Sequence, residues 1–219
     1  IAICDGVCQA NEGMRWALPS REIIADSMEA IIGANRFDAA VLLASCDKIV
    51  PAALMAAARL DIPAIIVTGG AMMPGYQASC SRQVYGNDIR KALMDHTRGK
   101  ISDTEFLEME NCTYPGPGSC AMMGTANSMA CLTEAIGMSL PGSGTAPAVD
   151  AKRKRLARNS GKQVLELLAR GILPAQIMSR QALDNAIKAS MAIGASTNCV
   201  LHLLALAREL GYKLELETF

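Results

Sequence analysis

Short apolar runs alternate with longer amphipathic stretches through the first third of the chain. Residues 1–3, 39–44 and 62–68 are short and mostly apolar, as is typical of strands buried in a parallel sheet. Residues 19–34 and 51–60 lie between these runs and have the composition and spacing of helices. The resulting β-α-β-α-β order predicts an α/β fold with a parallel sheet.

The rest of the chain has a predominantly helical pattern. We expect helices at residues 84–98, 102–110, 122–138, 150–171, 178–193 and 200–210. Ser20 and Ser179 are candidate caps, and Ser102 and Glu105 have the spacing of a capping box. We interpret residues 6–16 as a polar loop, 81–111 as a surface excursion over the sheet and 214–219 as the start of another strand.

Two polar features among these helices have more than one interpretation. The break Gly194-Ala195-Ser196-Thr197-Asn198 is either a helical corner or an anion site made of backbone amides. The Lys-Arg-Lys-Arg run at 152–155 is interpreted as a solvated helix face. His96 is expected to be exposed and His202 to be a core histidine.

Length and charge narrow the class of protein. A chain of 219 residues suits one large α/β domain, and its 21 basic and 21 acidic residues leave no net charge to attract nucleic acid. No apolar run reaches the roughly 18 residues that cross a bilayer, and no basic leader precedes a cleavage site. We therefore expect a cytoplasmic protein without a membrane partner. The chain begins without methionine and looks like a piece of a longer polypeptide.

The eight cysteines are expected to be reduced, because a chain of this size with a large apolar core does not need disulfides. Their positions must decide which of them have a chemical role. Cys131 lies among apolar residues and is predicted to be core. Cys120 follows a Pro/Gly-rich loop and is expected at a helix start, where a thiol has a lowered pKa and is a good metal ligand, although packing is the alternative.

Chemistry is concentrated in Cys46-Asp47-Lys48, directly after the strand at 39–44 and before a helix. Ligands bind at this position in open α/β sheets. Asp5 follows the first predicted strand, so Asp5, the Cys46–Lys48 stretch and Cys120 are expected to converge on one sheet edge. Carboxylates suit Mg²⁺ and thiolates suit zinc or iron–sulfur clusters, so one site could hold two unlike metals. A structural zinc is disfavoured because Cys-x-x-Cys spacing is absent.

Several long motifs, in the same order, give the whole chain a strong resemblance to the family of dihydroxy-acid dehydratases and sugar-acid (phosphogluconate, arabinonate, xylonate) dehydratases. The motifs are DG at 5–6, EGMRWALPSREIIADS at 12–27, SCDKIVPAALMAA at 45–57, GSCAMMGTANSMACLTEA at 118–135, SLPGSGTAPAV at 139–149 and MAIGASTNCVLHLLALA at 191–207.

This resemblance implies two cofactors. Cys46 and Cys120 would ligate an iron–sulfur cluster, either 2Fe-2S or 4Fe-4S, and Asp5, Asp47 and Lys48 would bind Mg²⁺. In the family the lysine is carbamylated, which converts an ammonium that would repel Mg²⁺ into an oxygen donor. The alternative for Lys48 is an ion pair with Asp47.

The resemblance also implies the fold and the reaction. The chain would be residues 1–219 of a single three-layer α/β/α domain with a mostly parallel sheet, the N-terminal domain of a longer homodimeric enzyme. The reaction would dehydrate a 2,3-dihydroxy carboxylic acid to a 2-oxo acid. The serine base and a β-rich C-terminal domain would lie beyond this chain, and a first cluster cysteine would lie upstream of it. The chain alone is therefore expected to be inactive.

The sequence departs from the family pattern at a few positions. Ala10-Asn11 stands where a Gly-His pair is usual, and Cys8 stands where a small apolar residue is common. Pro117 stands where the branched-chain dehydratases tend to have cysteine. Asn11 cannot titrate near neutrality, which puts an acid–base role there in doubt. Dihydroxy-acid dehydratase of branched-chain amino-acid biosynthesis is preferred. The alternatives are a sugar-acid dehydratase and a non-catalytic truncated relative.

Overall fold

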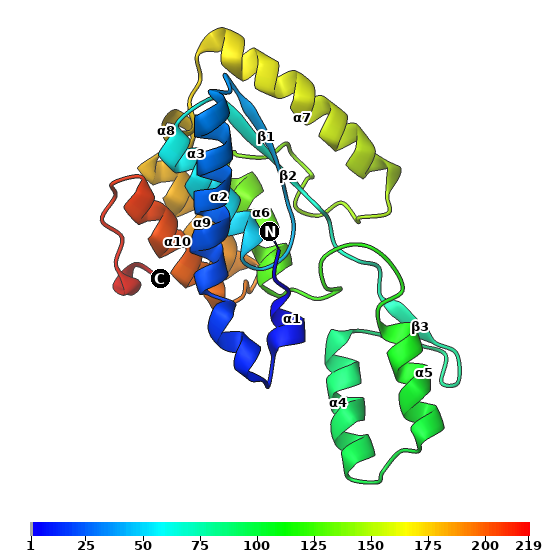
Figure 1. Ribbon diagram of the computed structural model, residues 1–219. Helices are drawn as coiled ribbons and strands as arrows, with labels where there is room; N and C mark the ends of the chain where they lie inside the picture. Colours follow the sequence, from blue (N-terminus) through cyan, green and yellow to red (C-terminus); the bar gives the residue numbers. More distant parts are fainter. Residues whose placement is uncertain (1) are drawn as a thin grey trace.

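A computed structural model describes residues 2–219 of the chain (Figure 1). Two parallel strands, β1 (Ala40–Ala44) and β2 (Ala64–Thr68), lie side by side and pair along their whole lengths. Helix α3 (Ile49–Leu60) connects them. The two strands and the helix predicted for this stretch are therefore confirmed.

The strand predicted at residues 1–3 is not found in its described part. Ile1 lies outside the described residues, and Ala2 and Ile3 belong to no strand. The chain turns instead into the short helix α1 (Asp5–Cys8), which is followed by the 3-10 helix η1 (Glu12–Trp16). The predicted polar loop at 6–16 is therefore partly helical.

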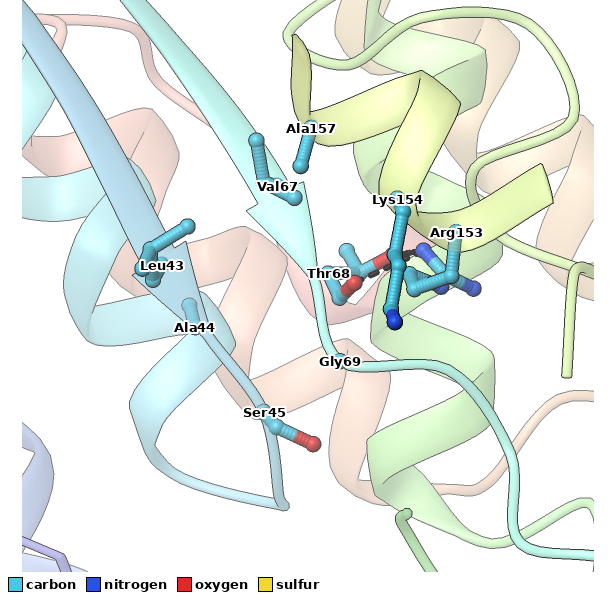
Figure 2. A pocket seen from close by; sticks show the side chains of 9 residues that line it. All are labelled: Leu43, Ala44, Ser45, Val67, Thr68, Gly69, Arg153, Lys154 and Ala157. Carbon is cyan, nitrogen blue, oxygen red and sulfur yellow. Dashed lines mark hydrogen bonds between the residues drawn. The ribbon is translucent and has the colours of Figure 1, made fainter. Parts of the chain in front are cut away.

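Helices lie on both faces of the β1–β2 pair, although Val41 and Leu43 of β1 stay exposed on the second face. Leu42 of β1 is buried in the main core with residues of α3. Leu43 points to the opposite face, because side chains alternate along a strand. Helix α7 (Ala151–Arg170) runs along that second face (Figure 1), and its Ala157 lines a cavity of about 350 Å³ together with Leu43 and Val67 (Figure 2). The expected three-layer α/β/α architecture is confirmed.

The main core lies on the α3 side of the strands. Helix α2 (Pro19–Asn35) packs along α3, and α6 (Thr125–Ile136), α9 (Arg180–Ala192) and α10 (Asn198–Glu209) complete this side. Small side chains at several helix contacts are completely buried and allow the helix backbones to approach closely. They include Ala53, Ala186 and Ala207.

Residues 75–113 form a projecting unit that extends away from the sheet (Figure 1). It consists of the antiparallel strands β3 (Gly75–Gln77) and β4 (Arg82–Val84) and the helices α4 (Gly86–Thr97) and α5 (Asp103–Thr113). Its apolar side chains, chiefly Val84, Ala92 and Met109, form a core of their own. The two helices were predicted, whereas the hairpin was not. The prediction that this segment lies over the sheet is wrong, because the apolar faces of α4 and α5 pack on each other.

Helix starts were predicted with mixed success. Ser102 and Glu105 form the expected capping box, and Ser179 caps α9. Ser20 does not cap α2; it lies within the helix and its hydroxyl donates to the carbonyl of Ala17 at 2.6 Å. The helix predicted from residue 122 begins at Thr125, after a turn that follows Cys120.

One residue of the basic run at 152–155 contradicts the solvated-face interpretation. Arg153 is buried, and it donates to the carbonyl oxygen of Thr68 at 2.7 Å (Figure 2). It donates likewise to the carbonyl oxygen of Ser143 at 2.9 Å. It also donates to the carbonyl of Ala146. The arginine therefore joins α7 to the carboxyl end of β2 and to the carbonyls of the loop at 143–146.

The remaining elements are short. α8 (Pro174–Ile177) precedes α9, and the chain ends in the 3-10 helix η2 (Leu216–Thr218) instead of the predicted strand. His96 is less exposed than expected, since its ring stacks on Phe106 with centroids 4.8 Å apart. None of the helices in residues 2–219 combines the length and the apolar character needed to cross a membrane.

Candidate functional site

The polar cluster after β1 lies where the sequence predicts it, in the turn between the carboxyl end of β1 and the start of α3. Cys46 takes a left-handed backbone conformation there, with φ of +83°. This region is unfavourable for a residue with a side chain, and such strain is often found at functional sites. The turn places Cys46, Asp47 and Lys48 side by side beyond the strand end.

Lys48 forms the buried centre of the cluster. Its ammonium donates to Asp5 at 2.7 Å and to Asp47 at 2.5 Å, and its side chain is only 5% exposed. Burial would lower the pKa of Lys48, but hydrogen bonds to Asp47 and Asp5 raise it above its ordinary value. Asp5 and Lys48 are thus brought together as predicted, and the amine forms the ion pair given above as the alternative to carbamylation.

His202 lies directly behind Asp47. It is fully buried, as predicted for a core histidine, with Nε2 3.6 Å from the carboxylate and Nδ1 3.2 Å from Arg21. Arg21 can only donate, so Nδ1 is an acceptor and Nε2 carries the proton toward Asp47. Burial lowers the pKa of His202. Burial would raise the pKa of Asp47, but His202 and Lys48 hold it at about 2, so the carboxylate is ionised at neutral pH.

Cys46 and Cys120 share one cavity with Asp5 and Asp47. This site cavity has a volume of about 240 Å³. The expected convergence of carboxylates and thiols is therefore confirmed. Burial raises the pKa of Cys46 to about 11 and also raises that of Cys120. The prediction of a lowered pKa at a helix start is wrong for Cys120, because α6 begins at Thr125. Both thiols are protonated until a metal ion displaces the proton.

The segment that carries Cys120 is held by backbone pairing. The amide of Ser119 donates to Gly70 at 2.9 Å, and the amide of Met72 donates back to Ser119 at 2.7 Å. Gly118 makes this approach possible, because a Cβ atom there would lie 2.5 Å from the amide nitrogen of Met72. The loop after β2 thus fixes Cys120 beside the turn that carries Cys46.

Asn127 of α6 is a positioning residue that sequence reasoning missed. Its amide donates to the carbonyl oxygens of Cys120 at 2.8 Å and Met122 at 2.7 Å, and its oxygen accepts from Ser119 at 2.6 Å. An asparagine early in an apolar helix is the signal that could have identified it, because a buried amide needs several partners.

The break at 194–198 is a helical corner that also lines the site cavity. Its Ser196 hydroxyl lies 2.9 Å from the Thr125 hydroxyl, and Asn198 donates to Thr125 at 3.1 Å. These bonds tie the start of α10 to the start of α6. The cavity also has lining residues that were not predicted, among them Cys4 and Arg90. Nothing in their local sequence marks them as parts of the site.

The donor set fits the two implied metal groups in its chemistry. Asp5 Oδ1 is buried and has no hydrogen-bond partner in residues 2–219, as expected of an oxygen available to a hard cation. Cys46 and Cys120 supply sulfur on the same cavity. In the described part of the chain, no three His, Cys, Asp or Glu side chains are grouped closely enough to hold a metal ion unaided. Each group would therefore need a further ligand.

Comparison with known proteins places the sequence in a family. The sequence model of "Dihydroxy-acid/6-phosphogluconate dehydratase N-terminal" matches residues 1–219. The chain is 51% identical to the dihydroxy-acid dehydratase of Halothermothrix orenii, 50% to that of Pyrococcus abyssi and 48% to dihydroxy-acid dehydratase 1 of Methanosarcina acetivorans. Each match covers 100% of this chain and 39% of the relative, so the chain spans about two fifths of their length. The chain therefore belongs to the dihydroxy-acid/6-phosphogluconate dehydratase family and matches its N-terminal part.

Proposed function

We propose that the protein containing this chain dehydrates a 2,3-dihydroxy carboxylic acid to a 2-oxo acid, as a dihydroxy-acid dehydratase of branched-chain amino-acid biosynthesis. The observation that carries the proposal is the convergence of Asp5, Asp47, Cys46 and Cys120 on one cavity in a chain of this family. The similar proteins are named dihydroxy-acid dehydratases, and this name favours a dihydroxy acid as the substrate. The family description also includes 6-phosphogluconate, so a sugar acid is the second candidate.

The proposed reaction removes one water molecule. The C2–H and C3–O bonds break, a proton and a hydroxide leave as water, and the resulting enol tautomerises to the 2-oxo acid. Mg²⁺ and an iron–sulfur cluster, when bound, would supply Lewis-acid chemistry at the substrate oxygens. We assign no residue of this chain as the base.

The chain's own residues would prepare the site for these groups. Asp5 and Asp47 would hold Mg²⁺, and Lys48 would join them once carbamylated. Nε2 of His202 faces the Asp47 carboxylate from behind at 3.6 Å, an electrostatic contact beyond hydrogen-bond distance. A second contact of this kind is typical around metal ligands and limits their movement.

The two thiols would hold the iron–sulfur cluster. Asn127 fixes the backbone beside Cys120, and the strained turn after β1 fixes Cys46. Because burial keeps both thiols protonated, binding of the cluster should release protons.

The proposal is tested on the intact protein after anaerobic reconstitution. Iron, sulfide and magnesium are measured, and 2-oxo acid formation is followed from 2,3-dihydroxyisovalerate and from C5 and C6 aldonates. Turnover of the first substrate supports the branched-chain assignment, and turnover of an aldonate alone supports the sugar-acid candidate. A protein without cluster and without turnover of any of them refutes the enzyme proposal.

The ligand assignment has a separate test. Cys46→Ser and Cys120→Ser are each expected to lose the visible absorption of the cluster, whereas Cys80→Ser, which alters an exposed thiol of the projecting unit, should retain it. Retention of the absorption in both site variants would contradict the assignment.

A further inference from the structure

The projecting unit contributes one charged residue to the site cavity. Arg90 of α4 lines this cavity together with Asp5, Asp47 and Cys120. Three other charged residues of α4 face away from the site cavity. Asp88, Lys91 and Asp95 line a different cavity, of about 520 Å³, within the projecting unit. Their spacing of three and four residues defines one helix face, and Arg90 lies off that face.

A contact between loop and helix fixes the start of α4 next to the site. Gly86 lies against Tyr114, so closely that a Cβ atom on Gly86 would be 2.8 Å from the tyrosine hydroxyl. Tyr114 belongs to the loop that leads to Cys120. The charge of Arg90 also reaches the site: burial raises the pKa of Cys120, and Arg90 acts in the opposite direction. Arg90 is therefore held near the cluster thiols by the same loop.

The charge balance of the cavity gives Arg90 a distinct position. Its other charged lining residues are the carboxylates Asp5 and Asp47, and the ammonium of Lys48 is already shared between them. Arg90 makes no hydrogen bond or ion pair within residues 2–219, whereas Arg82 of the same unit is paired with Asp88 at 3.0 Å. The guanidinium is free to bind an anion that enters the cavity.

We propose that Arg90 binds the carboxylate of the substrate at the mouth of the site cavity. This inference rests on the function proposed above, whose candidate substrates are all carboxylates. A guanidinium matches a carboxylate with two parallel hydrogen bonds, and arginine is favoured where such planar recognition is needed. Arg90 would then be a substrate-binding residue, and the projecting unit would supply it.

The test compares three variants of the reconstituted intact protein with 2,3-dihydroxyisovalerate or the aldonate that it turns over. Arg90→Gln is expected to raise KM about tenfold while kcat changes by less than twofold, because a charged hydrogen-bond pair is lost. Arg90→Lys keeps the charge without the two-pronged geometry and should have an intermediate KM. Lys91→Gln removes the same charge from the other face of the helix and should leave KM unchanged. Equilibrium binding of the 2-oxo acid product should weaken most in Arg90→Gln, less in Arg90→Lys and not at all in Lys91→Gln.

The outcomes separate this inference from the proposed function. A wild-type protein that forms no 2-oxo acid from any candidate refutes both. An active wild type in which Arg90→Gln behaves like Lys91→Gln, or loses kcat with KM unchanged, overturns the role of Arg90 alone. Competition by inorganic phosphate distinguishes the other possible anion: if Arg90→Gln changes inhibition by phosphate but not KM, Arg90 binds phosphate and the proposal is wrong.

Discussion

Lys48 is predicted to be the single side chain whose removal most destabilises the site. Replacing it by methionine leaves Asp5 and Asp47 facing each other without a cation, although their side chains are only 11% and 15% exposed. Two charge-assisted hydrogen bonds, of 2.7 and 2.5 Å, are lost with it. Removing one partner of a buried ion pair typically costs about 3–5 kcal/mol, because a buried charge is left unpaired. We expect Lys48→Met to lower the free energy of unfolding by about 4 kcal/mol at pH 7.

The pH dependence of this loss follows from the carboxylates. In the wild type the pKa of Asp47 is lowered to about 2, so its contribution is present above about pH 4 and is lost as the pH falls toward 2. This shift corresponds to about 2 kcal/mol. Without Lys48 the buried carboxylate of Asp47 should instead have a raised pKa and take up a proton at mildly acidic pH. The loss in free energy of unfolding of Lys48→Met relative to wild type should therefore be largest at neutral pH and fall by at least half at pH 4.

The assay is urea denaturation followed by circular dichroism at pH 7 and pH 4. EDTA and buffer freed of carbon dioxide keep the lysine as a free amine without metal. Lys188→Met, an exposed lysine of α9, is the matched control and should change stability by less than about 0.5 kcal/mol. A Lys48→Met variant as stable as wild type at pH 7, or equally destabilised at both pH values, would refute the reasoning.

Two further predictions concern packing and charge away from the site. Gly75→Ala should lower the free energy of unfolding by about 2 kcal/mol, because its Cβ would overlap the carbonyl oxygen of Cys112. Gly161→Ala, which has open space around it in a helix, should raise the melting temperature slightly. Equal melting temperatures of the two variants would contradict this prediction. Arg59→Met should cost about 2 kcal/mol in low salt and less in 1 M NaCl, because Arg59 joins α2, α3 and α10 through four carboxylates, including Glu209 at 2.7 Å. Urea denaturation at both salt concentrations measures the difference, and a loss that is independent of salt would show that packing is responsible.

The local pattern of the sequence determined the strands at 40–44 and 64–68, most of the helices and the position of the Cys46–Lys48 cluster at a strand end. These features depend on residues that are neighbours in the chain, so periodicity and capping signals are enough to find them. The same signals failed before Thr125, where a turn delays the start of the helix, so Cys120 does not lie at a helix start as predicted. Whether a turn or a helix follows a loop depends on partners that the local pattern does not contain, here the amide of Asn127.

Only the tertiary structure decided which distant groups meet. Arg153 lies in the same basic run as its exposed neighbours, so the local sequence does not distinguish it from them. It is buried because the fold brings the carbonyls of Thr68 and Ser143 to it. Arg90 reaches the site because the core of the projecting unit and Tyr114 set the direction of α4. Asp5, Lys48 and His202 are far apart in the chain. Burial and the hydrogen bonds to the carboxylates set the pKa of Lys48, and burial lowers that of His202. Motifs could name these residues, but their electrostatics arise from distances that only the folded chain fixes.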